Sequence, residues 1–294
     1  MITKAVVPIA GLGTRLFPAS HAFKKEMFPI VAPDGIARAL LHYQIKDLVE
    51  AGIQEICIIT QPGEQEMVLD YFKGPGDVYL KRLEKYPHLR SEADEMASMA
   101  DRLYFVEQTE QEGFGHAIYQ SKRFAAESPV LMCLGDHLFR GKEKSCHLQL
   151  IERFQETGGR SVSAVNKIAP EELRGYGTIS GKRRMNNRQL VDVDLIIEKP
   201  DIPTARVKLR VDGLENDEFL GWFGMHALAP SIYEVLERMI RDDIRQGGEF
   251  QMTYAQELQR QEEGYCAYEM LDGQRFDFGI PADFVTSVTN YAKE

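Results

Sequence analysis

The chain has 294 residues, of which 44% are hydrophobic and 27% are charged, ordinary values for a globular protein with a large buried core. Its 35 basic and 45 acidic residues give a net charge of -10. Because no long run of Lys or Arg interrupts this acidic excess, binding to nucleic acid is not expected. No segment approaches the ~20 apolar residues of a membrane span, so we expect no membrane partner.

The four cysteines, Cys57, Cys133, Cys146 and Cys266, show no CxxC spacing, and the first two lie inside apolar runs. Buried, reduced thiols are therefore expected. The N-terminus passes directly into an apolar strand and lacks the features of a secretory signal. These observations predict a cytoplasmic protein.

The first predicted element is a buried strand over residues 5–9, followed by the loop Gly11-Leu12-Gly13-Thr14-Arg15. Two glycines allow a sharp turn that brings backbone N–H groups close to an anion, while Arg15 and Lys25 add positive charge. A dinucleotide fingerprint would need a third glycine at position 16, which is Leu, and a P-loop would need Gly-Lys-Ser/Thr. The pattern predicts a loop that holds a polyphosphate, although two glycines alone also fit a simple turn. Pro8 is unusual inside a strand, because it cannot donate a ladder hydrogen bond.

Strands and helices then alternate along the chain. The predicted elements are a helix over 37–51 ended by Gly52, strands over 55–60 and 103–107, a helix over 114–125 and a buried strand over 130–134. Such alternation predicts a Rossmann-like α/β fold, with a mixed, mostly parallel sheet flanked by helices. Ligands collect at the carboxyl ends of parallel strands, so the loops 10–15, 108–115 and 135–137 are expected to share one crevice.

Two regions depart from this alternation. Residues 73–102 are charged and weakly helical, which fits a helical insertion, a subunit contact or a solvated excursion. After residue 160, short strands near 161–166, 176–180 and 189–197 carry Gly and Asn turns and predict a small antiparallel addition. Helices are predicted over 252–263 and 283–292. We interpret residues 1–294 as a single domain with a helical insertion at 73–102.

Asp136 ends an almost wholly apolar strand, where a carboxylate has little structural purpose. Carboxylates at strand ends commonly hold Mg²⁺ against a polyphosphate, because this hard cation prefers carboxylate and phosphate oxygens. Asp136 is therefore a candidate metal ligand.

The segments GLGTRLFPAS and KKEMFP, in this order near the N-terminus, resemble the signature of sugar-nucleotide pyrophosphorylases, most closely the bacterial UTP-glucose-1-phosphate uridylyltransferases. This resemblance implies that Ala10, Gly11, Gly13 and Thr14 contact a nucleotide and that Arg15 and Lys25 act in catalysis. It also implies that Gln108 and Gly113 read a pyrimidine base, since an amide can satisfy both N3–H and a carbonyl. By itself, Gln108 could equally be a surface residue beside a helix start.

The resemblance extends to the sugar and metal sites. It implies that Glu198 accepts hydrogen bonds from sugar hydroxyls, that Lys199 holds the phosphate of a sugar 1-phosphate, and that Gly177 contacts the sugar. It also implies that Asp277 is the second Mg²⁺ ligand beside Asp136. A solvated ion pair at 198–199 and a turn-forming role for Asp277 before Gly279 are the structural alternatives.

The implied reaction is attack of a sugar 1-phosphate on a nucleoside triphosphate, with UTP and glucose 1-phosphate as the favoured substrates. Other nucleotides such as dTTP or CTP, another sugar phosphate, or a non-catalytic sensor of nucleotide sugars remain alternatives. The resemblance also implies a homo-oligomer, a dimer or a tetramer.

The chain departs from the signature at several positions. Lys24 replaces a proline, His137 replaces Asp or Asn, Met225 and His226 replace Arg and Tyr, Tyr254 replaces Asp, and the stretch 33–38 differs throughout. One hypothesis is that His137, Met225 and His226 border the sugar and lessen exclusivity for glucose 1-phosphate. The alternative is that these positions face away from the pocket and that the substitutions are compensated changes in packing.

Overall fold

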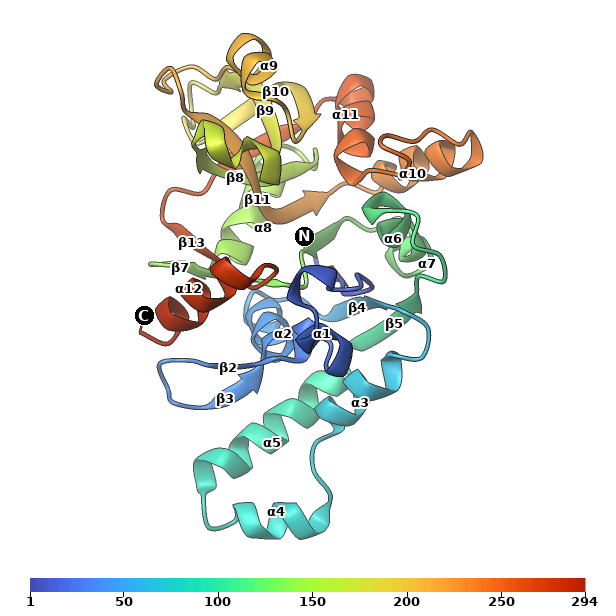
Figure 1. Cartoon of the computed structure of the whole chain (residues 1–294), viewed down its shortest axis with the longest axis vertical. Helices are drawn as coiled ribbons and strands as arrows, with labels where there is room; N and C mark the ends of the chain where they lie inside the picture. The colour runs from blue at the N-terminus through green and yellow to red at the C-terminus, as the bar shows by residue number, and fades with distance from the viewer. Residues whose placement is uncertain (294) are drawn as a thin grey trace.

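The computed structural model of the chain describes residues 1–293. Residue 294, which the single-domain prediction includes, lies outside the described residues. Within residues 1–293 one sheet of nine strands runs through the molecule (Figure 1). From edge to edge its strands are β5 (Leu103–Glu107), β4 (Glu55–Thr60), β1 (Lys4–Pro8), β6 (Val130–Cys133), β11 (Phe219–Leu228), β8 (Val162–Ile168), β12 (Cys266–Glu269), β10 (Leu190–Glu198) and β9 (Gly177–Arg183).

The relative direction of neighbouring strands changes across the sheet. Strands β5, β4, β1 and β6 are mutually parallel, whereas β11 runs antiparallel to both β6 and β8. Strand β12 is parallel to β8, and β10 and β9 continue the sheet in antiparallel pairs. The mixed α/β architecture predicted from the sequence is confirmed, and the antiparallel strands extend the same sheet.

Helices cover both faces of the sheet. They are α1 (Ala19–Ala22), α2 (Leu40–Glu50), α3 (Gln65–Lys73), α4 (Asp77–Leu83), α5 (Pro87–Ala100), α6 (Phe114–Gln120), α7 (Lys122–Ala125), α8 (Cys146–Glu156), α9 (Ile202–Lys208), α10 (Ser231–Arg241), α11 (Met252–Glu263) and α12 (Pro281–Tyr291). Within the described chain none of them is both long and apolar enough to cross a bilayer.

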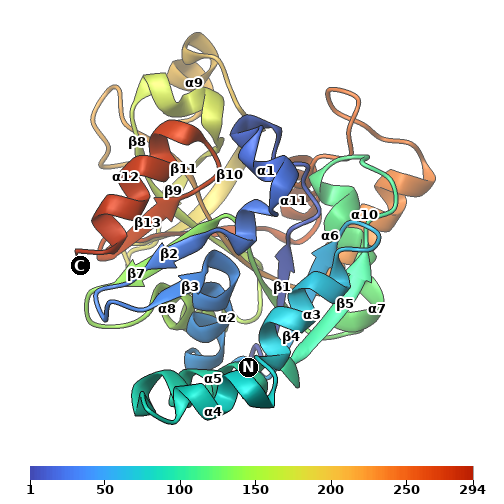
Figure 2. The same ribbon diagram turned by 60° about the horizontal axis from the view of Figure 1, so that its bottom comes forward.

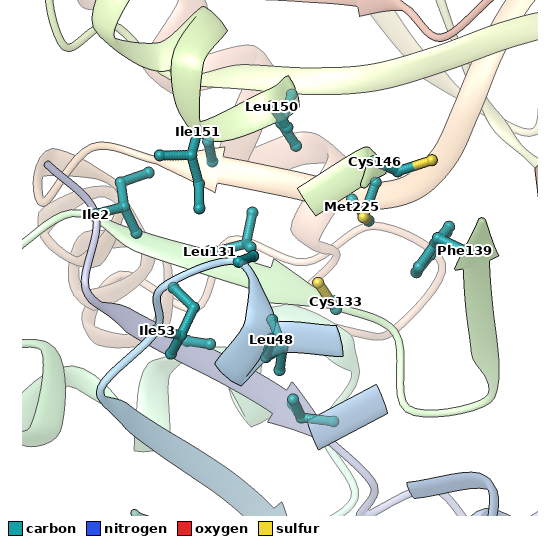
Figure 3. Packing of buried hydrophobic residues seen from close by; sticks show 14 of the residues in the cluster. Ile2, Leu48, Ile53, Leu131, Cys133, Phe139, Cys146, Leu150, Ile151 and Met225 are labelled. Carbon is teal, nitrogen blue, oxygen red and sulfur yellow. The ribbon is translucent and has the colours of Figure 1, made fainter. Parts of the chain in front are cut away.

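Alternate residues of β1 face two separate cores, as the two-residue period of a strand requires. Ala5 and Val7 belong to a cluster that α2, α3 and α8 cover, and Figure 3 shows Leu48, Leu150 and other members of it. Val6 lies on the opposite face, in a cluster that α6, α10 and α11 cover. Burial on both faces explains why β1 carries apolar residues at successive positions.

The helix predicted over 37–51 begins later in the structure, at Leu40. Residues Ala37–Ala39 instead form β3, which pairs antiparallel with β2 (Pro29–Val31). The predicted end is confirmed, because Gly52 has a φ of 92° and its N–H donates to the carbonyl of Val49.

A second small sheet pairs β7 (His137–Gly141) with β13 (Gly273–Asp277). This pairing was not predicted from the sequence. Its register places His137 directly opposite Asp277. Helix α12 packs against β13, with Phe276, Phe278 and Tyr291 in a shared cluster. The pair β7–β13 therefore joins residues more than a hundred positions apart at one place.

Residues 73–102 form α4 and α5, which lie together at one end of the molecule in both views (Figures 1 and 2). Helix α5 is tied to the β2–β3 hairpin by Arg38, whose Nη2 lies 2.5 Å from Glu92 Oε1. Helix α4 is mostly exposed and packs mainly against α5.

The position of Pro8 explains why β1 tolerates it. The N–H of Ile9 donates to the carbonyl of Ile59 in β4, so the backbone nitrogen of Pro8 faces the other neighbour, β6. Pairing between β1 and β6 covers only residues 4–6 of β1. The hydrogen bond that Pro8 cannot make is therefore beyond the end of this ladder.

His147 on α8 gives a pH-dependent prediction for stability. Both ring nitrogens are buried and have no hydrogen-bond partner among residues 1–293, and burial lowers the pKa of His147 to about 4. The unfolded chain takes up a proton near pH 6.5 but the folded one only near pH 4, so this histidine destabilises the fold increasingly as pH falls between these values. We expect His147→Phe to raise the Tm more at pH 5 than at pH 8, measured by thermal denaturation. The exposed His88→Phe is the control, and an equal shift at both pH values would contradict the prediction.

Candidate active site

Three loops at the carboxyl ends of β1, β5 and β6 line one cavity, as their positions predict. This first cavity has a volume of about 390 Å³, and its walls include Ala10, Gly11, Thr14, Lys25, Gln108, Gly113 and Asp136. A second cavity of about 270 Å³ has walls that include Arg15, Asp136, Gly177, Glu198, Lys199 and Asp277. The two cavities share Phe114, Leu134 and Asp136. The candidate residues therefore surround two adjoining spaces.

Gly13 lines neither cavity but makes the turn of the glycine loop. Its φ is 67°, and a Cβ added there would lie 3.1 Å from Ser20 Cβ, so a larger residue would strain both the backbone and its neighbour. Within residues 1–293 no protein group accepts a hydrogen bond from the backbone N–H of Gly11, Leu12 or Thr14. These amides are available to an anion.

Lys25 lies beside Asp136, with Nζ 2.5 Å from Oδ2, and 3.5 Å from the buried Glu26. Burial would lower the pKa of Lys25, but the two carboxylates outweigh it and raise that pKa above its usual value. Burial also raises the pKa of Glu26, to about 7. Lys25 thus remains a cation at neutral pH. Arg15, which is exposed and forms no ion pair within the described residues, adds a second positive charge at the second cavity.

Gln108 and Gly113 meet at the other end of the first cavity. Nε2 of Gln108 donates to the carbonyl of Gly113 at 3.2 Å and lies 3.3 Å from His116 Nδ1. Gly113 has a φ of 108°, and a Cβ there would lie 2.8 Å from Glu249 Cβ, so only glycine fits. Because a carbonyl can only accept, the amide group of Gln108 must point at Gly113, which leaves Oε1 as the free end of the side chain.

Asp136 and Asp277 converge from β6 and β13. A Cβ added at Gly279 would lie 2.5 Å from Asp136 Oδ2 and 3.1 Å from Asp277 Oδ1, so the two carboxylates face the same point. Burial would raise the pKa of each carboxyl, but the neighbouring His137, with Lys25 at Asp136, holds both below their ordinary values. Both side chains are therefore anionic at neutral pH. The position of His137 between them was not predicted: its Nε2 is 3.1 Å from Asp277 Oδ2 and its Nδ1 is 3.5 Å from Asp136 Oδ1.

Glu198 is the last residue of β10, Lys199 follows it, and both line the second cavity. Glu198 Oε2 accepts a hydrogen bond from Thr253 Oγ1 at 2.7 Å, and Lys199 Nζ lies 3.5 Å from Glu198 Oε1. Lys199 has a φ of 45°, and its side chain is 57% exposed, so the ammonium can reach a ligand despite this ion pair. Gly177 leaves room here, since a Cβ would clash with the indole of Trp222 and would lie 3.1 Å from Glu198 Oε2.

Comparison with known proteins decides the family. A family model described as nucleotidyl transferase matches residues 4–293. The chain belongs to the nucleotidyl transferase family.

This nucleotidyl transferase is similar to curated relatives along almost its whole length. It is 31% identical to UTP–glucose-1-phosphate uridylyltransferase 1 of Staphylococcus saprophyticus over 291 residues, which cover 99% of this chain and 93% of the relative. It is 30% identical to a UTP–glucose-1-phosphate uridylyltransferase of Staphylococcus epidermidis over 296 residues, covering 99% and 92%. A solved UDP-glucose pyrophosphorylase complexed with UDP-glucose has a TM-score of 0.78 at 26% identity, with 100% of this chain and 99% of that chain covered.

The nucleotidyl transferase departs from its expected pattern most clearly on β11. Trp222, Gly224 and His226 face the second cavity, whereas Met225 is fully buried in the first core cluster. The expectation that Met225 borders the sugar site is therefore wrong, because alternate residues of a strand point to opposite faces. His226 does line the cavity, where its Nδ1 lies 2.5 Å from Ser163 Oγ and 2.9 Å from Gln256 Nε2.

Sequence reasoning missed several residues of the second cavity in this nucleotidyl transferase. They are Tyr176, Trp222, Thr253, Gln256 and Arg275. Arg275 donates to the carbonyl of Trp222 at 3.1 Å and to the hydroxyl of Tyr176 at 2.6 Å. Thr253 and Gln256 lie three residues apart on α11, a spacing that places both on one helical face and could have signalled a shared site. Tyr254 instead packs against the second core cluster.

Proposed function

We propose that this nucleotidyl transferase joins UTP and glucose 1-phosphate to give UDP-glucose and pyrophosphate, with Mg²⁺ as its cofactor. The observation that carries this proposal is the meeting of the two cavities at Asp136, beside Lys25. Two substrates in these cavities would have their reacting phosphates at the shared wall. The choice of UTP and glucose 1-phosphate rests on the names of the relatives.

In the proposed reaction, an oxygen of the sugar phosphate attacks the α-phosphorus of UTP. A new P–O bond forms while the bond to the β-phosphate oxygen breaks, and pyrophosphate leaves in line. The main obstacle is repulsion between two polyanions, which Lys25, Arg15 and the amides of the glycine loop reduce. Lys199 positions the attacking phosphate. No general base is required, because that phosphate is already ionised at neutral pH.

Asp136 and Asp277 would hold the Mg²⁺. Two convergent anionic carboxylates, with the space that Gly279 leaves between them, fit a hard cation that also takes phosphate oxygens. When bound, the cation would supply further neutralisation of phosphate charge. Lys25 remains within reach of the same carboxylate, so protein and metal charges would act at one point.

The orientation of Gln108 supports a base that carries a proton on N3. With Nε2 directed at Gly113, Oε1 can accept N3–H of uracil or thymine, whereas N3 of cytosine offers no proton. CTP is therefore expected to be a poor substrate. Such a mismatch leaves buried polar groups unpaired, which is how a site gains strong selectivity.

A pyrophosphate-release assay with UTP, dTTP and CTP against glucose, galactose and mannose 1-phosphates tests the proposal. We expect pyrophosphate release that needs both substrates, is fastest with UTP and glucose 1-phosphate and is slow with CTP. His137 and His226 near the second cavity predict measurable kcat/KM with a second sugar phosphate. Ligand binding without pyrophosphate from any pair would instead indicate a non-catalytic sensor.

Glu198 provides a separate test of the second cavity. Because its contacts would be to sugar hydroxyls alone, Glu198→Ala is expected to raise KM for glucose 1-phosphate by about tenfold or more and leave KM for UTP nearly unchanged. Glu198→Gln, which keeps one acceptor oxygen, should lose less. Steady-state titration of each substrate at saturating levels of the other measures this, and equal losses for both substrates would assign Glu198 a structural role.

A further inference from the structure

Lys24 is nearly buried and lies next to the proposed catalytic Lys25, yet it lines neither cavity. Its side chain is 7% exposed, and its ammonium is 2.8 Å from Glu64 Oε2 and 2.9 Å from Glu64 Oε1. It also donates to the carbonyl of Gly11 at 3.1 Å. The charge of Lys24 is thus already paired, and its remaining contact is with the backbone of the glycine loop.

Other carbonyls of the same loop are held in a similar way. Gln111 Nε2 donates to the carbonyl of Ala10 at 3.3 Å, and Ser20 Oγ donates to the carbonyl of Gly13 at 2.8 Å. Gln61 Nε2 also lies 3.5 Å from the carbonyl of Gly11, a longer contact than that of Lys24. The donors therefore come from residues 20–24, from the loop after β4 and from the loop after β5. The N–H of Leu16 also donates to the carbonyl of Gly13 at 2.9 Å, where a short 3₁₀ helix begins. Among residues 1–293, the carbonyls of Ala10 and Gly11 are held by side chains alone, so these contacts help to define the conformation of the loop.

Holding a carbonyl also orients the next amide. In a planar trans peptide the C=O of one residue and the N–H of the following residue point in opposite directions. Fixing the carbonyls of Ala10, Gly11 and Gly13 therefore turns the amides of Gly11, Leu12 and Thr14 away from their side-chain donors. These three residues line the first cavity, and their amides have no protein acceptor within residues 1–293.

Glu64 holds the ammonium of Lys24 in place. It is the residue before α3, and its Oε2 also accepts the N–H of Gln61 at 3.0 Å. Gln61 follows β4, the neighbour of β1 in the sheet. The pair thus connects the glycine loop to the rigid end of the adjacent strand.

We propose that Lys24, held by Glu64, is a positioning residue that presents the glycine-loop amides to the phosphates of the nucleotide. This inference rests on the proposed function. Lys24 acts through the backbone of Gly11 and does not itself contact substrate. Its loss should weaken the nucleotide selectively, because the sugar phosphate binds in the other cavity.

The test measures UTP binding by isothermal titration calorimetry with Mg²⁺ present, and KM for glucose 1-phosphate at saturating UTP. Lys24→Met keeps the apolar stem and removes the donor, and we expect the Kd for UTP to rise about tenfold with KM for glucose 1-phosphate unchanged. Lys24→Arg, which retains a donor and a charge, should recover most of the affinity. Lys46→Met removes a similar ion pair, with Glu95 on α5, and should leave both constants unchanged.

The double variant Lys24→Met/Glu64→Gln separates positioning from charge. It changes no net charge, so a positioning role predicts the same loss of UTP affinity as in Lys24→Met. Restoration of wild-type affinity in the double variant would show that an unpaired Glu64 merely repels phosphate, and would overturn the proposal. Glu64→Gln alone keeps the lysine but loosens it, and a loss of about threefold is expected. If Lys24→Met fails to fold, Glu64→Gln tests the positioning role by itself, and unchanged affinity for UTP in this variant would contradict it.

Failure of the positioning role and failure of the proposed function give different results. Unchanged UTP affinity in Lys24→Met, in a protein whose wild type binds UTP and releases pyrophosphate, would overturn the positioning role alone. Equal weakening of both substrates would also overturn it, because that pattern indicates general destabilisation. A wild-type protein that does not bind UTP would overturn the proposed function and this inference together.

Discussion

Replacing Lys25 by Ala is expected to lower kcat by at least about a hundredfold, the usual effect of removing a group that stabilises charge in the transition state. Lys25 lines the first cavity beside Asp136, the residue where the two cavities meet, and Asp136 and Glu26 raise its pKa, so it is cationic at neutral pH. The fold should survive, since the residue lies in a single turn of 3₁₀ helix (Lys25–Met27) between α1 and β2. Circular dichroism and thermal denaturation would check this.

Steady-state rates of pyrophosphate release measure the effect. Lys46→Ala, which removes an ammonium from α2 outside both cavities, is the matched control and should retain wild-type kcat. A wild-type kcat in Lys25→Ala would remove this residue from the chemistry. Loss of melting cooperativity instead would indicate a structural role for its pair with Asp136.

Asp136→Asn and Asp277→Asn are each expected to abolish most activity and to weaken binding of the divalent cation. An amide keeps the shape of the side chain but removes the negative charge that a hard cation requires. The wild-type protein should lose activity in a chelator and regain it with added Mg²⁺. Cation binding is measured independently by the paramagnetic resonance of Mn²⁺ in place of Mg²⁺.

Asp272→Asn serves as the control, because Asp272 precedes β13 at the end opposite Asp277. It should bind the cation and turn over like the wild type. If Asp277→Asn keeps the wild-type rate and the same Mg²⁺ dependence, the assignment of Asp277 as partner of Asp136 is wrong. Loss of activity without loss of Mn²⁺ binding would give these carboxylates a role other than metal binding.

Local patterns in the sequence were enough to predict the parallel half of the sheet. Strands β1, β4, β5 and β6 are short apolar runs bounded by turn residues, and the helices between them carry apolar faces. Because ligands collect at the carboxyl ends of such strands, the loop cavity could also be predicted. These features depend on neighbouring residues, which is why the sequence order reveals them.

The second half of the molecule depended on contacts that sequence order does not show. Strand β11 pairs with β6, β8 and β9, and β13 pairs with β7 across more than a hundred residues. The face that Met225 presents is decided by the register of β11, and a shift of one residue would exchange it with His226. The prediction that Met225 borders the sugar was wrong for this reason.

By itself, the sequence determined the family signature, the glycine loop, the strand-end Asp136 and the alternation that builds the parallel sheet. The resemblance also implied that Asp277 accompanies Asp136. Only the tertiary structure decided that His137 lies against both carboxylates, that Gln108 turns its amide to Gly113, and that Lys24 holds Gly11. The first group follows from backbone preferences and from the period of apolar residues, which act over a few positions. The second group follows from pairing and packing between distant segments, whose energies depend on where the folded chain places each side chain.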